Sequence, residues 1–151
     1  MRKRFFIITT VLLVIGILTY LQCLNKAISK ENIICINITN NCSEEIYGIH
    51  YENKLYEQLG VGSIVHANET LIKTGEVLSI ELTPTNLCNK DDLSGFTIEF
   101  FVILEDAKEI SCGTPMKLDV EYGGYYDFSL SGNRGSGFKL VKEDYDGKLK
   151  S

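Results

Sequence analysis

The sequence begins with an uninterrupted apolar run that restricts how the chain can fold. After the basic cluster Arg2-Lys3-Arg4, residues 5–24 read FFIITTVLLVIGILTYLQCL and contain no charged side chain. At about 1.5 Å per helical residue, such a run is about 30 Å long, which matches the hydrocarbon core of a bilayer. We therefore predict a transmembrane signal anchor over 5–24, with the basic start, 1–4, in the cytoplasm because positive residues stay inside. The rest of the chain is then extracytoplasmic.

A cleavable signal peptide is the alternative interpretation of this segment. Signal peptides have an apolar region of about 7–15 residues, followed by a cleavage site with small residues. The run here is longer than that, which favours a single-pass anchor in the cell membrane. However, Ala27-Ile28-Ser29 is an acceptable cleavage site. Cleavage near Ser29 would make the remainder a secreted protein.

The remainder of the chain alternates apolar and polar residues with the period of two that is typical of β-strands. Turn signals rich in Gly and Asn separate the alternating segments. We predict a linker over 25–31, a β domain over 32–142 and a flexible tail over 143–151. The expected fold is an antiparallel immunoglobulin-like β-sandwich of about seven to nine strands, with a small β-barrel as the alternative. Alternation is clear over 32–39, 46–52, 76–83, 96–104, 117–122, 125–131 and 137–141, and weaker over 62–66 and 108–112.

Charge limits the classes of partner. The whole chain has a formal net charge of −5, and setting aside the three cations of the N-terminal cluster leaves −8 for the remainder. Nucleic-acid binding needs clustered Lys and Arg, so we expect no nucleic-acid partner. An acidic surface can attract cations or a basic partner, or it can simply keep the domain solvated.

Four cysteines follow the apolar run, and an even number in an exported domain indicates disulfides. Of the three pairings, we expect Cys88–Cys112, because these residues flank the strand over 96–104 and its return strand. This leaves Cys35–Cys42, which could meet only across a loop longer than a two-residue turn. Unpaired buried thiols are the alternative. The sequence has no CxxC pair, so neither a thioredoxin-type site nor a zinc ribbon is predicted.

No pattern of residues predicts catalysis. His50 and His66 are the two histidines, and neither stands at the spacing of a zinc site. No serine lies in a nucleophile-elbow motif. We therefore predict no catalytic, metal-binding or cofactor-binding residues. A structure that placed either histidine within hydrogen-bond reach of a serine and an acid would favour a hydrolase instead.

Tyrosine provides the candidate binding surface. Two tyrosines follow the flexible pair Gly123-Gly124, and tyrosine beside glycine is frequent in contact surfaces. On the strand over 46–52, alternation places the histidine opposite its tyrosine neighbours and toward solvent. The predicted surface comprises His50, Tyr51, Tyr125 and Tyr126, and of these Tyr126 alternates with the predicted core.

Two segments, Gly75–Leu82 (G-E-x-L-x-I-x-L) and Tyr122–Phe128 (Y-G-G-Y-Y-x-F), stand within this plan of a basic start, one apolar span and one β domain. The plan resembles small uncharacterised envelope-anchored proteins of Gram-positive bacteria. The resemblance covers the organisation of the whole chain and implies no activity or catalytic residue. We expect a membrane-anchored extracytoplasmic binding module, without catalytic activity of its own, that has a protein or cell-envelope partner. The alternatives are a secreted or anchored hydrolase or hydrolase inhibitor, and an envelope immunity or stress-protection protein.

Overall fold

The computed structural model describes residues 15–16 and 32–143, and it divides the chain into two compact units, 1–32 and 33–151. Of the predicted membrane span, Ile15 and Gly16 are described, and both are helical. The rest of that span, the basic start, the linker over 25–31 and the tail beyond residue 143 lie outside the described residues. Within the described ranges, no helix has the length and apolar character needed to cross a membrane.

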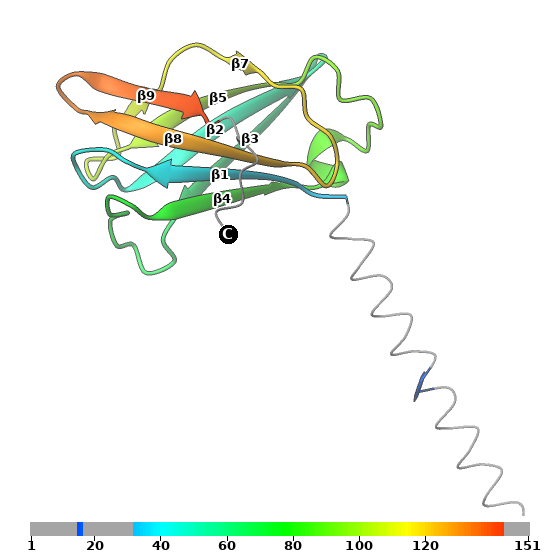
Figure 1. Ribbon diagram of the computed structural model, residues 1–151, viewed down its shortest axis with the longest axis horizontal. Helices are drawn as coiled ribbons and strands as arrows, with labels where there is room; N and C mark the ends of the chain where they lie inside the picture. Colours follow the sequence, from blue (N-terminus) through cyan, green and yellow to red (C-terminus); the bar gives the residue numbers. More distant parts are fainter. Residues whose placement is uncertain (1–14, 17–31, 144–151) are drawn as a thin grey trace, which may run out of the picture. The chain divides into compact units, whose positions relative to one another are not determined.

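Over its described residues, the second unit is built from strands and one short 3-10 helix, η1, which confirms the predicted all-β class (Figure 1). Strand positions follow the alternation of the sequence, because each strand turns one apolar face toward the interior. The elements are β1 (Ile34–Asn40), β2 (Gly48–Leu55), β3 (Gln58–Val65), β4 (Val77–Leu82), η1 (Pro84–Leu87), β5 (Thr97–Ile103), β6 (Glu109–Ser111), β7 (Met116–Lys117), β8 (Tyr125–Asn133) and β9 (Gly137–Lys142).

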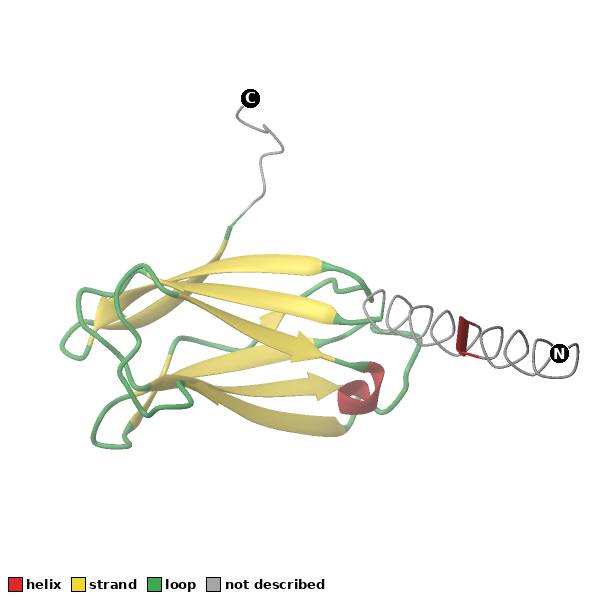
Figure 2. Ribbon diagram, turned by 90° about the horizontal axis from the view of Figure 1, so that it is seen from below, coloured by secondary structure: helices red, strands yellow, loops and turns green. Residues whose placement is uncertain are grey.

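The strands form two sheets that face each other as separate layers (Figure 2). The smaller sheet has the order β4-β1-β8-β9, and the larger sheet has the order β3-β2-β5-β6, with β7 beside the start of β5. Both sheets are open at their edges, so the fold is a sandwich and the barrel alternative was wrong. The expectation of wholly antiparallel pairing was also wrong, because β1 runs parallel to β8, with Ile36 opposite Tyr126. A parallel pair needs a long connection, and here the whole larger sheet lies between the two strands in the sequence.

The core lies between the two sheets. Its centre includes Ile34, Ile36 and Ile38 of β1, none of which has any exposed surface. The rings of Phe100 from the larger sheet and Phe128 from the smaller sheet meet with their centroids 6.0 Å apart. Every buried side-chain nitrogen and oxygen atom of the described residues has a hydrogen-bond partner. Since unpaired polar groups are costly in such an interior, this completeness is expected of a stable core.

The first strand does not turn back on itself at Asn40-Asn41. Beyond Asn40 the chain leaves the smaller sheet, and β2 lies in the larger one. The backbone N–H of Asn41 donates to the carbonyl of Leu130, and that of Ser43 donates to the carbonyl of Gly132. These bonds hold the segment that follows β1 against the end of β8. From there the chain crosses to the other layer, where β2 begins.

Candidate functional site

Strand β3, at the edge of the larger sheet, turns three exposed aliphatic side chains toward solvent. On β3, Leu59 is 65% exposed, Val61 is 64% exposed and Val65 is 42% exposed. The register places Ser63 opposite His50 on β2, and His50 is in turn opposite Phe101 on β5. Because Ile49 and Ile64 point to the core, the residues between them in the alternation point outward. We call the surface formed by Leu59, Val61, Ser63, Val65, His50 and Phe101 the β3 surface.

Two glycines shape the inner side of β3. A Cβ atom on Gly62 would overlap the ring of Tyr51, and one on Gly60 would overlap the side-chain amide of Asn53. The neighbouring strand therefore fills the space that the glycines leave empty, which compensates for their poor strand propensity. Tyr51 packs inward against the core, and this burial raises the pKa of its hydroxyl. The structure thus removes Tyr51 from the predicted binding surface.

His50 lies at the centre of the β3 surface with three polar or aromatic neighbours. Its Nδ1 is 3.0 Å from Oγ of Ser63, and its ring centroid is 5.6 Å from that of Phe101, at a tilt of 53°. Its Nε2 is 3.8 Å from Oε1 of Glu52 on the same strand. The side chain is 19% exposed. The histidine therefore faces solvent, as predicted, but its ring is largely covered by its neighbours.

A hydrolase would need His50 to be hydrogen-bonded to both a serine and an acid, and only the serine contact is present. The hydroxyl of Ser63 is within hydrogen-bond reach of His50, but the carboxylate of Glu52 is farther away than a hydrogen bond allows. His66 repeats the arrangement, with Nδ1 3.0 Å from Oγ1 of Thr70 and Nε2 3.6 Å from Oε2 of Glu76. Because both histidines have such neighbours, the grouping reflects how a surface imidazole finds local partners. A catalytic triad needs the acid bonded to the imidazole.

The two adjacent tyrosines of β8 have different environments. Tyr125 is 71% exposed, whereas Tyr126 is buried and its hydroxyl accepts a hydrogen bond from the backbone N–H of Glu121 at 2.9 Å. Burial raises the pKa of the Tyr126 hydroxyl. Tyr125 points outward from the smaller sheet, and His50 points outward from the larger one. The predicted surface is therefore not contiguous, because these two residues lie on opposite faces of the sandwich.

The four described cysteines are all free thiols, so neither predicted disulfide is formed. Cys112 directly follows β6 at the edge of the larger sheet, where its N–H donates to the carbonyl of Phe100 on β5. Cys88 follows η1, and a loop of eight residues separates it from β5. Cys35 faces outward between the core isoleucines of β1, whereas Cys42 is fully buried. The members of each predicted pair therefore lie in different places in the sandwich.

Burial also changes the acidity of the interior thiols. It raises the pKa of Cys112 to about 12 and that of Cys42 to about 11. The thiolate is the reactive and metal-binding form of cysteine, so these two groups are inert at neutral pH. Across residues 15–16 and 32–143, no group of three or more His, Cys, Asp and Glu side chains could hold a metal ion.

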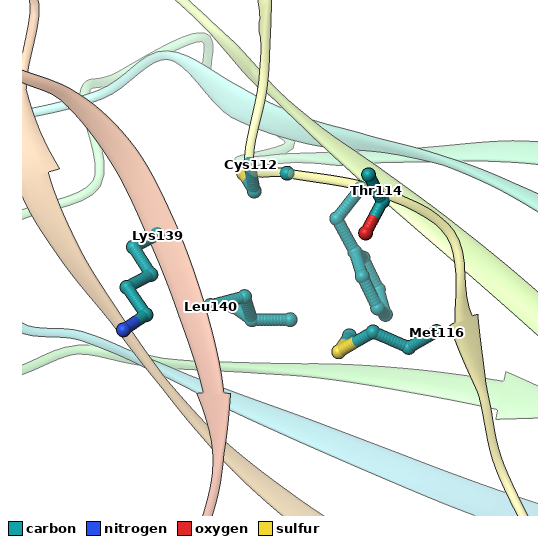
Figure 3. Close-up of a pocket in the computed structure, with 7 residues that line it drawn as sticks. Cys112, Thr114, Met116, Lys139 and Leu140 are labelled. Carbon is teal, nitrogen blue, oxygen red and sulfur yellow. The ribbon is translucent and has the colours of Figure 1, made fainter.

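A cavity of about 240 Å³ opens between β5, β7 and β9 (Figure 3). Leu140 and Met116 point into it, while the ammonium end of Lys139 points away. Pockets that bind small molecules are usually larger, at about 300–1,000 Å³, and combine apolar walls with several convergent polar groups. This cavity offers one hydroxyl, from Thr114, so it is a weaker candidate than the β3 surface. Its lining comprises Phe100, Cys112, Gly113, Thr114, Met116, Lys139 and Leu140.

The sequence analysis missed the three exposed apolar residues of β3. Leu59, Val61 and Val65 stand at odd positions, with the period of two that marks one strand face. The intervening Gly60 and Gly62 hid this pattern, because glycine is scarce in strands. A hairpin signal was also absent, since the turn residues are Tyr56 and Glu57 in place of Asn-Gly.

No family model and no curated protein matches this sequence. Among solved structures, the fold is similar to part of a chain in the structure of a disulfide-locked mutant of Intermedilysin with human CD59. The sequences are 8% identical, the match covers 74% of this chain and 24% of that chain, and the TM-score is 0.36. A likeness at this level carries no argument about function.

Proposed function

We propose that the protein is an interaction module of the cell envelope. In this proposal, the apolar segment 5–24 anchors the chain in the membrane, and an immunoglobulin-like sandwich outside it binds a protein partner through the β3 surface. The observation that carries the proposal is the row of exposed aliphatic side chains on one strand, Leu59, Val61 and Val65.

The physical argument rests on desolvation. Fully burying a Val or Leu side chain is favourable by about 1.5–3 kcal/mol relative to leaving it in water. Soluble domains avoid aligning such side chains on their surface unless a partner covers them. The aromatic rings of His50 and Phe101 extend this face across β2 and β5, and the charged residues Glu52 and Lys54 of β2 lie opposite Val61 and Leu59. Apolar side chains bordered by polar ones are the usual anatomy of a protein–protein contact.

The membrane anchor is tested by fractionating native cells and measuring the intact mass of the protein in each fraction, without reductant. A full-length mass in the membrane fraction supports the anchor. A mass shortened to a residue near Ser29, found in the medium, overturns the anchor and makes the protein a secreted one.

The binding surface is tested in living cells with a photo-crosslinking amino acid. One variant carries it in place of Val61, and the matched control carries it in place of Val141, an exposed valine of β9 in the other sheet. The proposal predicts a discrete crosslinked protein at Val61 that is absent at Val141. No crosslink at Val61, or the same crosslinks at both positions, would overturn it.

A hydrolase is the second candidate function, because the hydroxyl of Ser63 lies within hydrogen-bond reach of His50. The test is release of nitrophenol from p-nitrophenyl acetate by the full chain and by Ser63→Ala. A serine hydrolase would lose at least about 1,000-fold in rate on losing its nucleophile. Equal, background-level rates for both proteins are the result that the interaction module predicts.

A further inference from the structure

The backbone of β3 presents a free edge on the same residues that carry the exposed side chains. The β2–β3 hairpin has a two-residue loop, and Leu55 is paired with Gln58 next to it. In such a hairpin the pair beside the loop exchanges hydrogen bonds, and every second pair after it does the same. Gly60, Gly62 and Ile64 therefore bond to β2. The N–H and C=O groups of the residues between them point away from the sheet.

This edge lacks the features that normally protect edge strands. β3 is eight residues long, and its sequence QLGVGSIV contains no charged residue and no proline. It is the outermost strand of the larger sheet, with β2 as its one paired neighbour among the described strands. Natural proteins usually shorten such an edge or place lysine or proline on it, because an open edge is a template for another strand.

Charge indicates what kind of strand fits here. Residues 32–143 contain 17 Asp and Glu against eight Lys and Arg. Glu57 immediately precedes β3, and Glu69 lies in the exposed loop that follows it. A second copy of this acidic domain would be repelled, whereas an extended segment with basic side chains would be attracted.

We propose that β3 binds an extended segment of another protein as an added strand, and that this segment alternates apolar residues with Lys or Arg. The proposal rests on the proposed function, because it describes how the β3 surface engages its partner. Alternate side chains of the added strand would extend the row formed by Leu59, Val61 and Val65. The basic side chains on its other face would meet the acidic field of the domain. The backbone would supply affinity, and the side chains would supply selectivity.

The direct test uses the full chain in micelles of an uncharged detergent. The probe is a nine-residue synthetic peptide of alternating Lys and Val, and the control is a peptide of the same length with Glu in place of Lys. Amide exchange is followed by NMR. We expect the N–H groups of Val61 and Ser63 to gain at least about tenfold protection with the Lys peptide, as one new hydrogen bond implies, while amides of β9 stay unchanged. Unchanged exchange at Val61 and Ser63 under saturating peptide would overturn the proposal.

Two substitutions at one position isolate the backbone contribution. Ser63→Ala and Ser63→Pro both remove the hydroxyl that contacts His50, but only proline also removes the outward N–H. We expect Ser63→Pro to bind the Lys peptide about tenfold more weakly than Ser63→Ala does, which is the effect of one hydrogen bond. If Ser63→Pro fails to fold, the exchange measurement on the natural chain decides.

The outcomes separate the two proposals. Equal binding by Ser63→Pro and Ser63→Ala, with weaker binding by Val61→Ser, would overturn strand addition while the face-binding function stands. Peptide binding at β3 without any crosslink at Val61 in cells would overturn the proposed function and leave the edge site standing. Preference for the Glu peptide would overturn the proposal that the partner segment is basic. Sedimentation of the free protein as a dimer through β3 would overturn it as well, because a second copy would then occupy the edge.

Discussion

The side-chain amide of Asn40 donates a hydrogen bond of 3.1 Å to the backbone carbonyl of Ile72, which is 32 positions further along the chain. The side-chain oxygen of Asn40 accepts a second bond of 3.1 Å, from the backbone N–H of Cys42. Asn40 is fully buried at the end of β1. The Asn40 side chain thus holds the backbone at Cys42 and the backbone at Ile72 together, at the point where the chain leaves the smaller sheet.

We predict that Asn40→Ala destabilises the sandwich by about 2 kcal/mol, because it leaves the buried N–H of Cys42 without a partner. The carbonyl of Ile72 keeps its bond from the N–H of Ile46, so it contributes less to the loss. Denaturant unfolding followed by tyrosine fluorescence measures the change. The control is Asn41→Ala, whose side chain makes an exposed bond to Ser129, and we expect it to cost less than about 0.5 kcal/mol. Equal losses for the two variants would contradict this assignment.

Gly132 and Gly75 provide a second comparison, because both have positive φ angles but differ in their surroundings. Gly132 has φ +115°, and a Cβ there would overlap the carbonyl oxygen of Gly137 across the β8–β9 pair; Gly75 has φ +89° and open space around it. We expect Gly75→Ala to cost about 1–2 kcal/mol through backbone strain alone. Gly132→Ala adds the overlap and should cost about 3–4 kcal/mol. Thermal or denaturant unfolding of both variants checks the order, and a smaller loss for Gly132→Ala would refute it.

Alternation along the sequence predicted most strands because each buries one face. The residues Ile34, Ile36 and Ile38 are the clearest case, since all three are fully buried as the period of two requires. The segment over 117–122 shows where this reasoning stops. Leu118 and Val120 are buried, but the strand there covers only Met116–Lys117. Alternation reports which side chains turn inward, and it does not report whether a neighbouring strand is present to pair with the backbone.

The candidate site was less accessible to sequence reasoning than the fold. The solvent-facing position of His50 followed from its place in a strand. Its contact with Ser63 depends on the register of β2 against β3, and that register is fixed by a loop without a recognisable turn signature. The expected disulfides failed for a related reason. Cysteine spacing along the chain does not specify which layer of a sandwich each residue enters, and Cys42 enters the interior only because the chain crosses between sheets after β1.

The thiols should react with iodoacetamide at pH 8 in an order set by exposure and pKa. Cys88 is exposed, whereas burial raises the pKa of Cys42 to about 11 and that of Cys112 to about 12, so these two hold almost no thiolate. We expect Cys88 to be alkylated first, and Cys42 and Cys112 to react only when the domain opens. Peptide mapping by mass spectrometry over time measures the order, with Cys88→Ser as the control that removes the fast phase. Labelling of Cys42 as fast as that of Cys88 would show that the core is open.

The Tyr56–Asp92 contact predicts how stability changes in acid. The hydroxyl of Tyr56 donates to Oδ2 of Asp92 at 2.5 Å, and the backbone N–H of Ser94 donates to Oδ1 at 2.9 Å. These bonds, led by the one from Tyr56, lower the pKa of Asp92 from 3.8 to about 2. A carboxyl whose pKa is lower in the folded protein stabilises it above the unfolded pKa, and this contribution is lost as the pH falls through the folded pKa. The stabilisation from Asp92 is therefore complete above about pH 4 and absent below about pH 2.

Tyr56→Phe removes the main donor to Asp92, so it should weaken this part of the acid dependence. We expect the unfolding midpoint of the natural chain to exceed that of Tyr56→Phe at pH 6, and the difference to shrink as the pH is lowered from about 4 to about 2. Tyr125→Phe is the matched control, because it also removes an exposed tyrosine hydroxyl and should show no such convergence. The measurement is a series of urea unfolding curves between these pH values. A difference for Tyr56→Phe that is the same at pH 6 and pH 2 would mean that the Tyr56 hydroxyl stabilises the fold independently of the ionisation of Asp92, and would contradict this assignment.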